Sequence, residues 1–599
     1  MKITPFAWGI SFFILLSCNT HKEKSYPDAD AVYLNLKKTF VLNKDGSIVN
    51  SVEKKQKLFT YRAFQSLYGE TRITYNPEFQ KLVVNEAYTT NSGNQTIKTP
   101  ENGFNEVLPP ICQNSKAYNQ LREMVVSHTG LDRNALINCS YNVTTAAGKI
   151  PFLMGIEELQ TDCPIENLTI IVQVPSSKKL HYKSLNFTSE PVLEIGNELD
   201  TYTWKFHDLA QRPKEIQSAL VGEDIPALLF STQKDQSIVI NWYLGQLSFT
   251  NSIGDAAKKY VDNVIKDKKS WQEKALKVQE IVVNEIKTLQ IPGPLTAFRA
   301  RPADEIWQSN SGTVPEKAIL LTTLLRSEGF NAELCLNVPE SLSGEKLPFL
   351  LVAEPIVKIS GSNSETLLLA ADRLNSGNSD FGYTPFRVLP LNIAHQALAA
   401  DTPKSKIQIE GKLKINDDSN LQGELTGQFT GSFNPYFEII RNQGKCPQFL
   451  SGFRGTVGKS TAELSNISFK VESSDQLIKR ENFRFLDLVE CKTGISSFHL
   501  IPMSFTRNSA FYLGTTIDES YHYSFTLPAT RQLVNPVNIE LLKPGIGHVL
   551  ISLKQTGSVV EVIRKIGIFN PVIAKKDYAD FRELIDKWNT HKFKQLIIK

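Results

Sequence analysis

The sequence has little net charge and none of the short motifs that identify common cofactor or metal sites. Its 599 residues carry 66 Lys or Arg and 62 Asp or Glu, a formal net charge of +4. So small a charge on so long a chain gives no electrostatic reason to expect a nucleic-acid partner. No HExxH, CxxC, phosphate-loop or dinucleotide-binding pattern occurs, and the nine histidines lack metal-ligand spacing. We therefore expect no metal, no cofactor and no nucleic acid.

Long apolar runs are also missing, and the one apolar stretch near the amino end is short. Lys2 precedes it, and residues 5–17 fall short of the ~20 that a membrane-spanning helix requires. The stretch ends in Leu15-Leu16-Ser17-Cys18, which resembles a bacterial lipobox. The resemblance implies a signal peptide over 1–17, cleavage before Cys18 and acylation of that residue, with 18–25 as a lipidated tether.

Acylation of Cys18 implies attachment to a membrane, because each buried methylene contributes about 0.8 kcal/mol. Asn19, and not Asp, follows Cys18. By analogy with sorting in Gram-negative bacteria, this predicts the outer membrane. The sequence leaves open whether the protein occupies the periplasmic or the cell-surface face. The alternative is an ordinary cleaved signal in which the cysteine has no role.

Cysteine is sparse, with seven in the chain including Cys18. An oxidising compartment would allow the other six to form disulfides, whose pairing the sequence cannot resolve. Cys335 lies inside an apolar run, which favours a buried free thiol. The grouping of the others predicts one bridge within the set of Cys112, Cys139 and Cys163. It predicts a second bridge between Cys446 and Cys491.

The mature chain is too long for one hydrophobic core, so several domains are expected. Residues 26–248 alternate short strands with turns, as in Ala31-Val32-Tyr33-Leu34-Asn35-Leu36, which predicts a β-sandwich. Strands return over 405–599, where we predict a second β-sandwich. A stripe of Tyr578, Phe581, Ile585 and Trp588 indicates a helix near the end, followed by a last strand at 596–598.

Between these parts, residues 254–396 have the pattern of an α+β domain. Apolar residues recur at helical spacing over 256–289, which predicts one long helix. A second helix is expected over 315–328, with Thr313 and Glu316 as a capping box and Gly329 as the C-cap. Strands are then expected at 332–338, 349–359 and 366–371. The whole chain is therefore predicted to be mainly β and multidomain.

Three stretches bring the chain close to a known arrangement. They are Phe104-Asn105-Glu106-Val107-Leu108-Pro109, Gly222-Glu223-Asp224-Ile225-Pro226 and Trp307-Gln308-Ser309-Asn310-Ser311-Gly312-Thr313. Together they resemble bacterial lipoproteins with an N-terminal domain of unknown function (the 3857 type), a transglutaminase-like domain and a C-terminal β domain. The resemblance covers nearly the whole mature chain and implies a papain-like core in the centre.

Active members of the wider transglutaminase-like group carry a Cys-His-Asp triad. Their cysteine begins a helix, where the backbone amides lower its pKa, in a stretch that reads roughly Gly-Asp-Cys-Lys-Asp-Lys-Ala. Here the corresponding stretch begins at Gly312, and the nucleophile position holds Val314. The histidine position corresponds to about Leu351, and the aspartate is matched by Asp372. Two of the three catalytic positions are apolar, which implies a degenerate domain that is not an enzyme.

Other residues with suggestive chemistry have simpler interpretations. Cys335 has no adjacent base, and His395 lies at the exit of the central domain. Asp372 beside Arg373 is interpreted as an ion pair at a strand end. Asp417 and Asp418 indicate a hairpin turn, since a full calcium loop is missing. The aromatic run Phe433-Asn434-Pro435-Tyr436-Phe437 fits core packing better than an exposed binding platform.

The sequence therefore predicts a non-catalytic, outer-membrane-associated lipoprotein. Its pseudo-transglutaminase domain would bind a peptide or protein, or act as a scaffold, with an envelope protein as its partner. One alternative is a transglutaminase- or peptidase-like cysteine enzyme, which requires an unrecognised nucleophile paired with a histidine across domains. The other is a carbohydrate-binding lipoprotein, which requires several aromatic rings exposed in a row.

Overall fold

The computed structural model describes most of the chain. The described residues are 24–113, 115–212, 215, 218, 225–248, 253–339, 349–361, 366–374, 386–391, 398–399, 404–416, 420–430, 450–451, 455–460, 467–473, 477–488, 490–491, 494–495 and 506–599. Several predictions fall outside them, namely the signal peptide, Cys18, His395, the pair Asp417 and Asp418, the run from Phe433, and Cys446. Within the described ranges, no helix has the length and apolar character needed to span a membrane.

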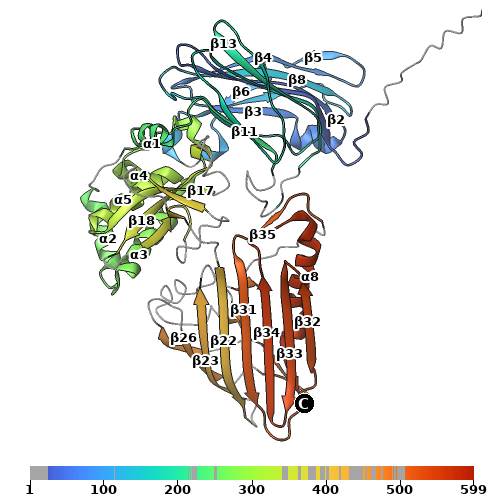
Figure 1. Cartoon of the computed structure of the whole chain (residues 1–599), viewed down its shortest axis with the longest axis vertical. Helices are drawn as coiled ribbons and strands as arrows, with labels where there is room; N and C mark the ends of the chain where they lie inside the picture. Colours follow the sequence, from blue (N-terminus) through green and yellow to red (C-terminus); the bar gives the residue numbers. More distant parts are fainter. Residues whose placement is uncertain are drawn as a thin grey trace, which may run out of the picture.

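The chain is mainly β and multidomain, as the sequence predicts (Figure 1). An N-terminal unit at the top of the figure is followed by a helix-rich central unit and by a C-terminal unit dominated by one large sheet. Glu215 joins the first and last of these. Its carboxylate accepts hydrogen bonds from the backbone N–H of Asn508 at 2.8 Å and from the hydroxyl of Ser509 at 2.6 Å.

An eight-stranded sheet forms the base of the N-terminal unit, in the order β12-β13-β10-β1-β2-β8-β4-β5. It is antiparallel except for the parallel pair of β1 and β10. Gly46, with φ of 87°, occupies the left-handed position of the turn between β1 and β2. The strands are β1 (Ala31–Leu42), β2 (Ile48–Leu58), β4 (Gln80–Thr90), β5 (Thr96–Lys98), β8 (Leu136–Thr145), β10 (Ile165–Pro175), β12 (Val192–Glu194) and β13 (Leu199–Leu209).

Two three-stranded sheets pack against this base and complete a sandwich-like core. One has the order β11-β14-β9 and the other β3-β7-β6. Phe40 on β1 contacts Phe230 on β14 across the core, with ring centroids 5.0 Å apart. The strands are β3 (Glu70–Tyr75), β6 (Phe104–Val107), β7 (Arg122–Ser127), β9 (Met154–Glu158), β11 (His181–Leu185) and β14 (Ala227–Ser231).

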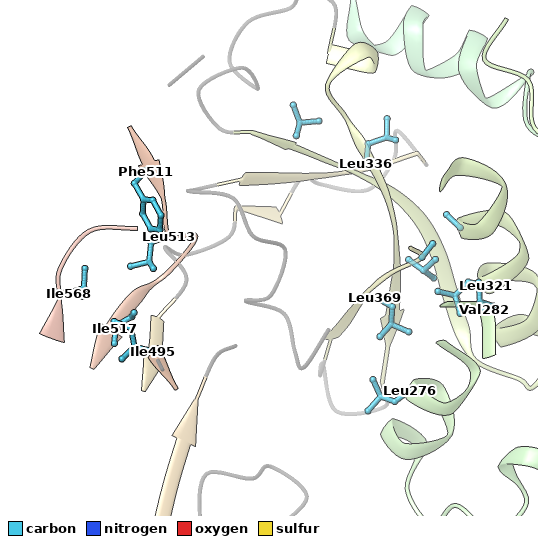
Figure 2. Close-up of a cluster of buried hydrophobic side chains, with 14 of the residues drawn as sticks. Leu276, Val282, Leu321, Leu336, Leu369, Ile495, Phe511, Leu513, Ile517 and Ile568 are labelled. Atoms are coloured by element: carbon cyan, nitrogen blue, oxygen red, sulfur yellow. The ribbon is translucent and has the colours of Figure 1, made fainter. Parts of the chain in front are cut away.

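The central unit packs helices on a five-stranded antiparallel sheet of order β19-β18-β17-β20-β21. Figure 2 shows Leu276, Val282 and Leu321 from two of the helices beside Leu369 of the sheet. These side chains are buried, so their burial drives the docking of the helices. The elements are α1 (Gln236–Leu244), α2 (Asp255–Ile265), α3 (Trp271–Glu285), α4 (Ala303–Ser309), α5 (Val314–Ser327), β17 (Asn331–Pro339), β18 (Glu354–Ser360), β19 (Thr366–Ala370), β20 (Phe386–Pro390) and β21 (Leu398–Ala399).

Two local predictions in this unit are wrong. The single helix expected over 256–289 is divided into α2 and α3, because Ser270 caps α3 in a capping box with Glu273. The chain then enters β15 (Lys287–Leu289), which pairs in parallel with β16 (Ser311–Thr313). The strand expected over 349–359 starts late, since residues Phe349–Leu351 form a 3₁₀ turn and β18 begins at Glu354.

The C-terminal unit has a second eight-stranded sheet, in the order β25-β26-β23-β22-β31-β34-β33-β32. Its second layer includes a helix and a small sheet of order β27-β28-β36. The predicted helical stripe is confirmed, as all four of its residues are buried. The elements are β22 (Lys404–Ile415), β23 (Leu421–Thr430), β25 (Gly455–Ser460), β26 (Ile467–Ser473), β27 (Ile478–Arg480), β28 (Phe483–Asp487), β31 (Thr516–Thr526), β32 (Val537–Lys543), β33 (Gly547–Thr556), β34 (Val559–Ile568), α8 (Tyr578–Asn589) and β36 (Gln595–Ile598).

The predicted bridge among Cys112, Cys139 and Cys163 is absent from the structure. All three are buried free thiols. Cys112 packs in a separate apolar cluster from the other two, and the side-chain amide of Gln56 donates to Sγ of Cys163 at 3.8 Å. Cys491 is buried, and the predicted bridge from it to Cys446 falls outside the described residues.

Candidate functional site

The start of α5 is fixed by the capping box that the sequence predicts. Glu316 Oε2 accepts a hydrogen bond from the backbone N–H of Thr313 at 2.8 Å, and Oγ1 of Thr313 accepts one from the N–H of Glu316 at 3.4 Å. These bonds satisfy backbone donors that the first helical turn would otherwise leave without partners. Val314, the first residue of the helix, is therefore held in a defined position.

Glu316 is completely buried and is compensated by groups from other segments. Arg301 forms a two-point ion pair with it, through Nε at 2.7 Å from Oε1 and Nη2 at 3.1 Å from Oε2. The hydroxyl of Tyr118, from the N-terminal unit, donates to Oε1 at 2.7 Å. Burial, and then the adjacent carboxylate, raises the pKa of Tyr118, so this hydroxyl stays protonated. The N-terminal unit thus helps to hold the first turn of α5.

Lys317, the next residue, is also buried. Its Nζ donates to the backbone carbonyl of Ile286 at 2.7 Å and to Oγ1 of Thr288 at 2.8 Å. Burial lowers the pKa of Lys317 to about 8, and the carboxylate of Asp372 partly offsets that effect. The lysine therefore ties the start of α5 to the end of α3 and to β15.

A cavity of about 700 Å³ opens beside this helix start. Val314, Leu351 and Asp372 all line it, so the fold gathers the three positions singled out in the sequence. Val314 comes from α5, Leu351 from the 3₁₀ turn before β18, and Asp372 from the segment after β19. Ile156 and Glu158 of β9 add a wall from the N-terminal unit.

Asp372 is engaged in an ion pair. Nη1 of Arg373 lies 3.0 Å from Oδ1 of Asp372, and the same nitrogen pairs with the carboxylate of Glu354. The sequence-based interpretation of Asp372 and Arg373 as an ion pair at a strand end is confirmed. The charge of this aspartate is therefore compensated within the cavity wall.

The described lining of this cavity holds no cysteine, serine or histidine. Thr313 lines it, but its Oγ1 already accepts the capping hydrogen bond. Cys335, on β17, lies in an apolar cluster with Ile356 and Val388, and burial raises its pKa to about 12. Its neighbour Leu336 lines the cavity instead, because successive residues of a strand point to opposite faces.

A second cavity of about 600 Å³ lies between the same two units. Phe79 and Tyr118 from the N-terminal unit line it, together with Gln246 and Ala297. It shares two lining residues, Thr296 and Arg299, with the larger cavity. No pattern in the sequence indicated Thr296 or Arg299 as site residues, because the cavity lining joins segments that are more than a hundred positions apart.

Two domain models match parts of the chain. A domain of unknown function with a solved structure, DUF3857, matches residues 44–213, and a second, DUF3858, matches residues 495–598. The first match confirms the N-terminal part of the resemblance. The lipoprotein and transglutaminase-like parts stay predictions. No curated protein matches the chain significantly.

A solved structure resembles almost the whole chain. It is a proposed protease from Parabacteroides distasonis ATCC 8503, with 24% identity and a TM-score of 0.71, covering 95% of this chain and 99% of its own. A proposed cysteine protease from Cytophaga hutchinsonii is 11% identical, with a TM-score of 0.18, covering 59% of this chain and 85% of its own. The first likeness shows a shared fold. The second is too weak to support an argument.

Proposed function

We propose that this protein is a non-catalytic binding or scaffolding protein of the cell envelope. Its central unit would be a degenerate transglutaminase-like domain that holds a peptide or protein segment in the larger cavity. The observation that carries the proposal is that Val314, Leu351 and Asp372 line one cavity. These are the positions where the resemblance places the nucleophile, the base and the carboxylate that orients the base.

The residues at these positions lack the chemistry of acyl transfer. The side chain of Val314 has no atom that can attack a carbonyl carbon, and Leu351 cannot accept a proton. Asp372 has no imidazole to orient and instead pairs with Arg373. A cavity that keeps its shape without a nucleophile and a base supports binding without reaction.

The size and lining of the cavity suit a short stretch of polypeptide. Ligand sites in proteins span about 300–1,000 Å³, with mainly apolar walls and a few polar groups. Leu336, Leu350 and Phe298 provide apolar surface, while Gln290 and Thr296 provide polar groups. Because β9 forms one wall, a segment bound here would contact both the N-terminal and the central unit.

Calorimetric titration with N-acetylated pentapeptides of alanine and leucine tests binding at this cavity. The expected result is saturable binding to the unmodified protein and at least tenfold weaker binding to Val314→Trp, which fills the cavity. Val192→Trp is the matched control, because Val192 is 62% exposed on the edge strand β12 and lines neither cavity. Leu351→Arg, at another lining residue of the same cavity, gives a second test should Val314→Trp lower the unfolding temperature.

Incubation of the same peptides with the protein, followed by mass spectrometry, tests the absence of catalysis. We expect no cleavage and no cross-linking over a day. Turnover that disappears after substitution of one side chain would refute the proposal and favour the enzyme alternative. Binding that is unchanged in both Val314→Trp and Leu351→Arg would show that the peptide binds outside this cavity.

The same proposal includes a lipid anchor at Cys18 on the outer membrane, with an envelope protein as the partner. The lipobox-like sequence Leu15-Leu16-Ser17-Cys18 supports it. Growth with a labelled fatty acid should label the unmodified protein, whereas Cys18→Ala should stay unlabelled and leave the membrane fraction. Labelling that persists in Cys18→Ala would contradict the anchor.

A further inference from the structure

A short loop separates the two cavities and presents one cationic side chain to both. The loop contains η5 (Gly293–Thr296), and Thr296 and Arg299 line the larger and the smaller cavity alike. Arg299 is exposed, and within the described part of the chain no hydrogen bond or ion pair engages its guanidinium. The two other arginines in these linings, Arg301 and Arg373, are compensated by carboxylates.

The loop has an unusual backbone just before Arg299. Ala297 and Phe298 are consecutive residues with positive φ, at 50° and 58°, a conformation that is unfavourable for residues with a side chain. Such strain persists only where the surroundings impose it, and it occurs preferentially at functional sites. The fold thus holds the backbone just before Arg299 in a conformation that Ala297 and Phe298 would not favour on their own.

Contacts from both units impose this conformation. The N–H of Phe298 donates to the carbonyl of Gly293 at 2.8 Å, and the ring of Phe298 packs edge-on against Trp242. A Cβ on Gly293 would meet that ring at 2.7 Å, so only glycine allows the loop to fold back so closely. Asn76 of the N-terminal unit donates its side-chain amide to the carbonyl of Leu295 at 2.9 Å.

The remaining charges limit the kind of anion that fits. Glu158 lines the larger cavity and Glu78 the smaller one, and both are exposed. These carboxylates repel a polyanion, whereas a single carboxylate can approach Arg299 and form two parallel hydrogen bonds with its guanidinium. Lys149, in the smaller cavity, adds a second cation on that side only.

We propose that Arg299 is the specificity residue for the ligand and binds one carboxylate of a peptide that lies along the two cavities. The carboxylate is either the end of a peptide chain or an acidic side chain. This inference rests on the proposed function, because it names the class of peptide that the same cavity takes. It predicts that peptides with a carboxylate bind more tightly than neutral peptides of equal apolar content.

Calorimetry with four N-acetylated alanine and leucine pentapeptides tests the proposal. In the first pair, neither peptide has an acidic side chain, and one ends in a free carboxylate while the other ends in a carboxamide. In the second pair, both peptides end in a carboxamide, and one carries a central glutamate while the other carries a central glutamine. We expect at least one carboxylate peptide to bind about tenfold more tightly than its neutral counterpart. Arg299→Gln should remove this preference, so that each carboxylate peptide binds no more tightly than its neutral counterpart.

Lys259→Gln is the control, because Lys259 is exposed on α2 and lines neither cavity. Equal affinity of the unmodified protein for charged and neutral peptides would refute the role of Arg299, and so would a preference that survives Arg299→Gln. The proposed function would still stand if Val314→Trp weakened all four peptides. Failure of every peptide to bind the unmodified protein would instead overturn both.

Discussion

The hydroxyl of Tyr118, in the N-terminal unit, donates a hydrogen bond of 2.7 Å to the buried carboxylate of Glu316 in the central unit. The guanidinium of Arg301 lies over the ring of the same tyrosine, 5.4 Å from its centroid. Nearby, the hydroxyls of Ser115 and Ser311 lie 2.9 Å apart. The start of α5, and with it one wall of the larger cavity, therefore depends on contacts between two units.

Glu316→Gln should destabilise the contact between these units. The substitution removes the charge that compensates Arg301, whose side chain is only 20% exposed. Breaking a buried ion pair by neutralising one partner costs about 3 kcal/mol, since the other charge stays desolvated. Urea denaturation followed by tryptophan fluorescence measures the loss. Glu305→Gln, at an exposed position of α4, is the control and should change the stability by less than about 0.5 kcal/mol.

The stability of the N-terminal unit should fall as the pH is lowered from about 6.5 to about 4. Burial, and then the positive charge of Lys54, lowers the pKa of His128 to about 4, and Oγ1 of Thr71 contacts its Nε2 at 2.8 Å. An unfolded histidine has a pKa near 6.5, so between these values the unfolded state binds more protons and acid favours it.

Denaturation at pH 7.0 and 4.5 measures this effect. His128→Gln should show a smaller loss of stability between the two pH values than the unmodified protein, while the exposed His207→Gln should behave like the unmodified protein. A titration of the His128 ring by NMR with a midpoint near 6.5 would contradict the prediction.

Gly155→Ala should destabilise the N-terminal unit by about 1–3 kcal/mol through overpacking. A Cβ at this position of β9 would lie 2.2 Å from an atom of the Phe230 ring. That ring is fully buried, so it has little room to move. Gly93→Ala is the matched control, since its Cβ would meet only Oδ1 of Asn91, at 3.4 Å. Equal stability of the two variants in a thermal melt would show that the core around Phe230 adapts.

Cys335 should resist alkylation in the folded protein. Burial raises its pKa to about 12, so almost no reactive thiolate is present at pH 8. Brief treatment with iodoacetamide and mass spectrometry of the digested protein should find Cys335 unmodified, and the same treatment in urea should label it. Rapid labelling without urea would identify an activated thiol and reopen the enzyme alternative.

Local patterns predict the elements that carry the site. The capping box of Thr313 and Glu316 was predictable because its two hydrogen bonds join residues three positions apart. The stripe on α8 was predictable for the same reason, since helical spacing follows from the backbone alone. The division between α2 and α3 also had a local signal, because Ser270 and Glu273 form a capping box. The prediction of one helix over 256–289 instead followed the apolar periodicity, which continues across this point.

The disulfide prediction failed because cysteine spacing carries no information on distance in space. Cys139 and Cys163 share an apolar cluster and Cys112 lies in another, yet all three remain free thiols. The same limit applies to the cavities, because β9, the loop before Arg299 and the segment after β19 meet only in the folded chain. No sequence pattern predicts that the consecutive residues Ala297 and Phe298 both adopt the left-handed conformation.

By itself, the sequence determined that the chain is mainly β, that a helix follows the capping box of Thr313 and Glu316, and that the residues at two of three expected catalytic positions are hydrocarbons. Only the tertiary structure decided that Val314, Leu351 and Asp372 share one cavity, that Tyr118 compensates Glu316, and that Arg299 stands between two cavities. The physical reason is the range of the interactions. Capping and periodicity act within a few residues, whereas burial and charge compensation depend on which distant segments the core brings together.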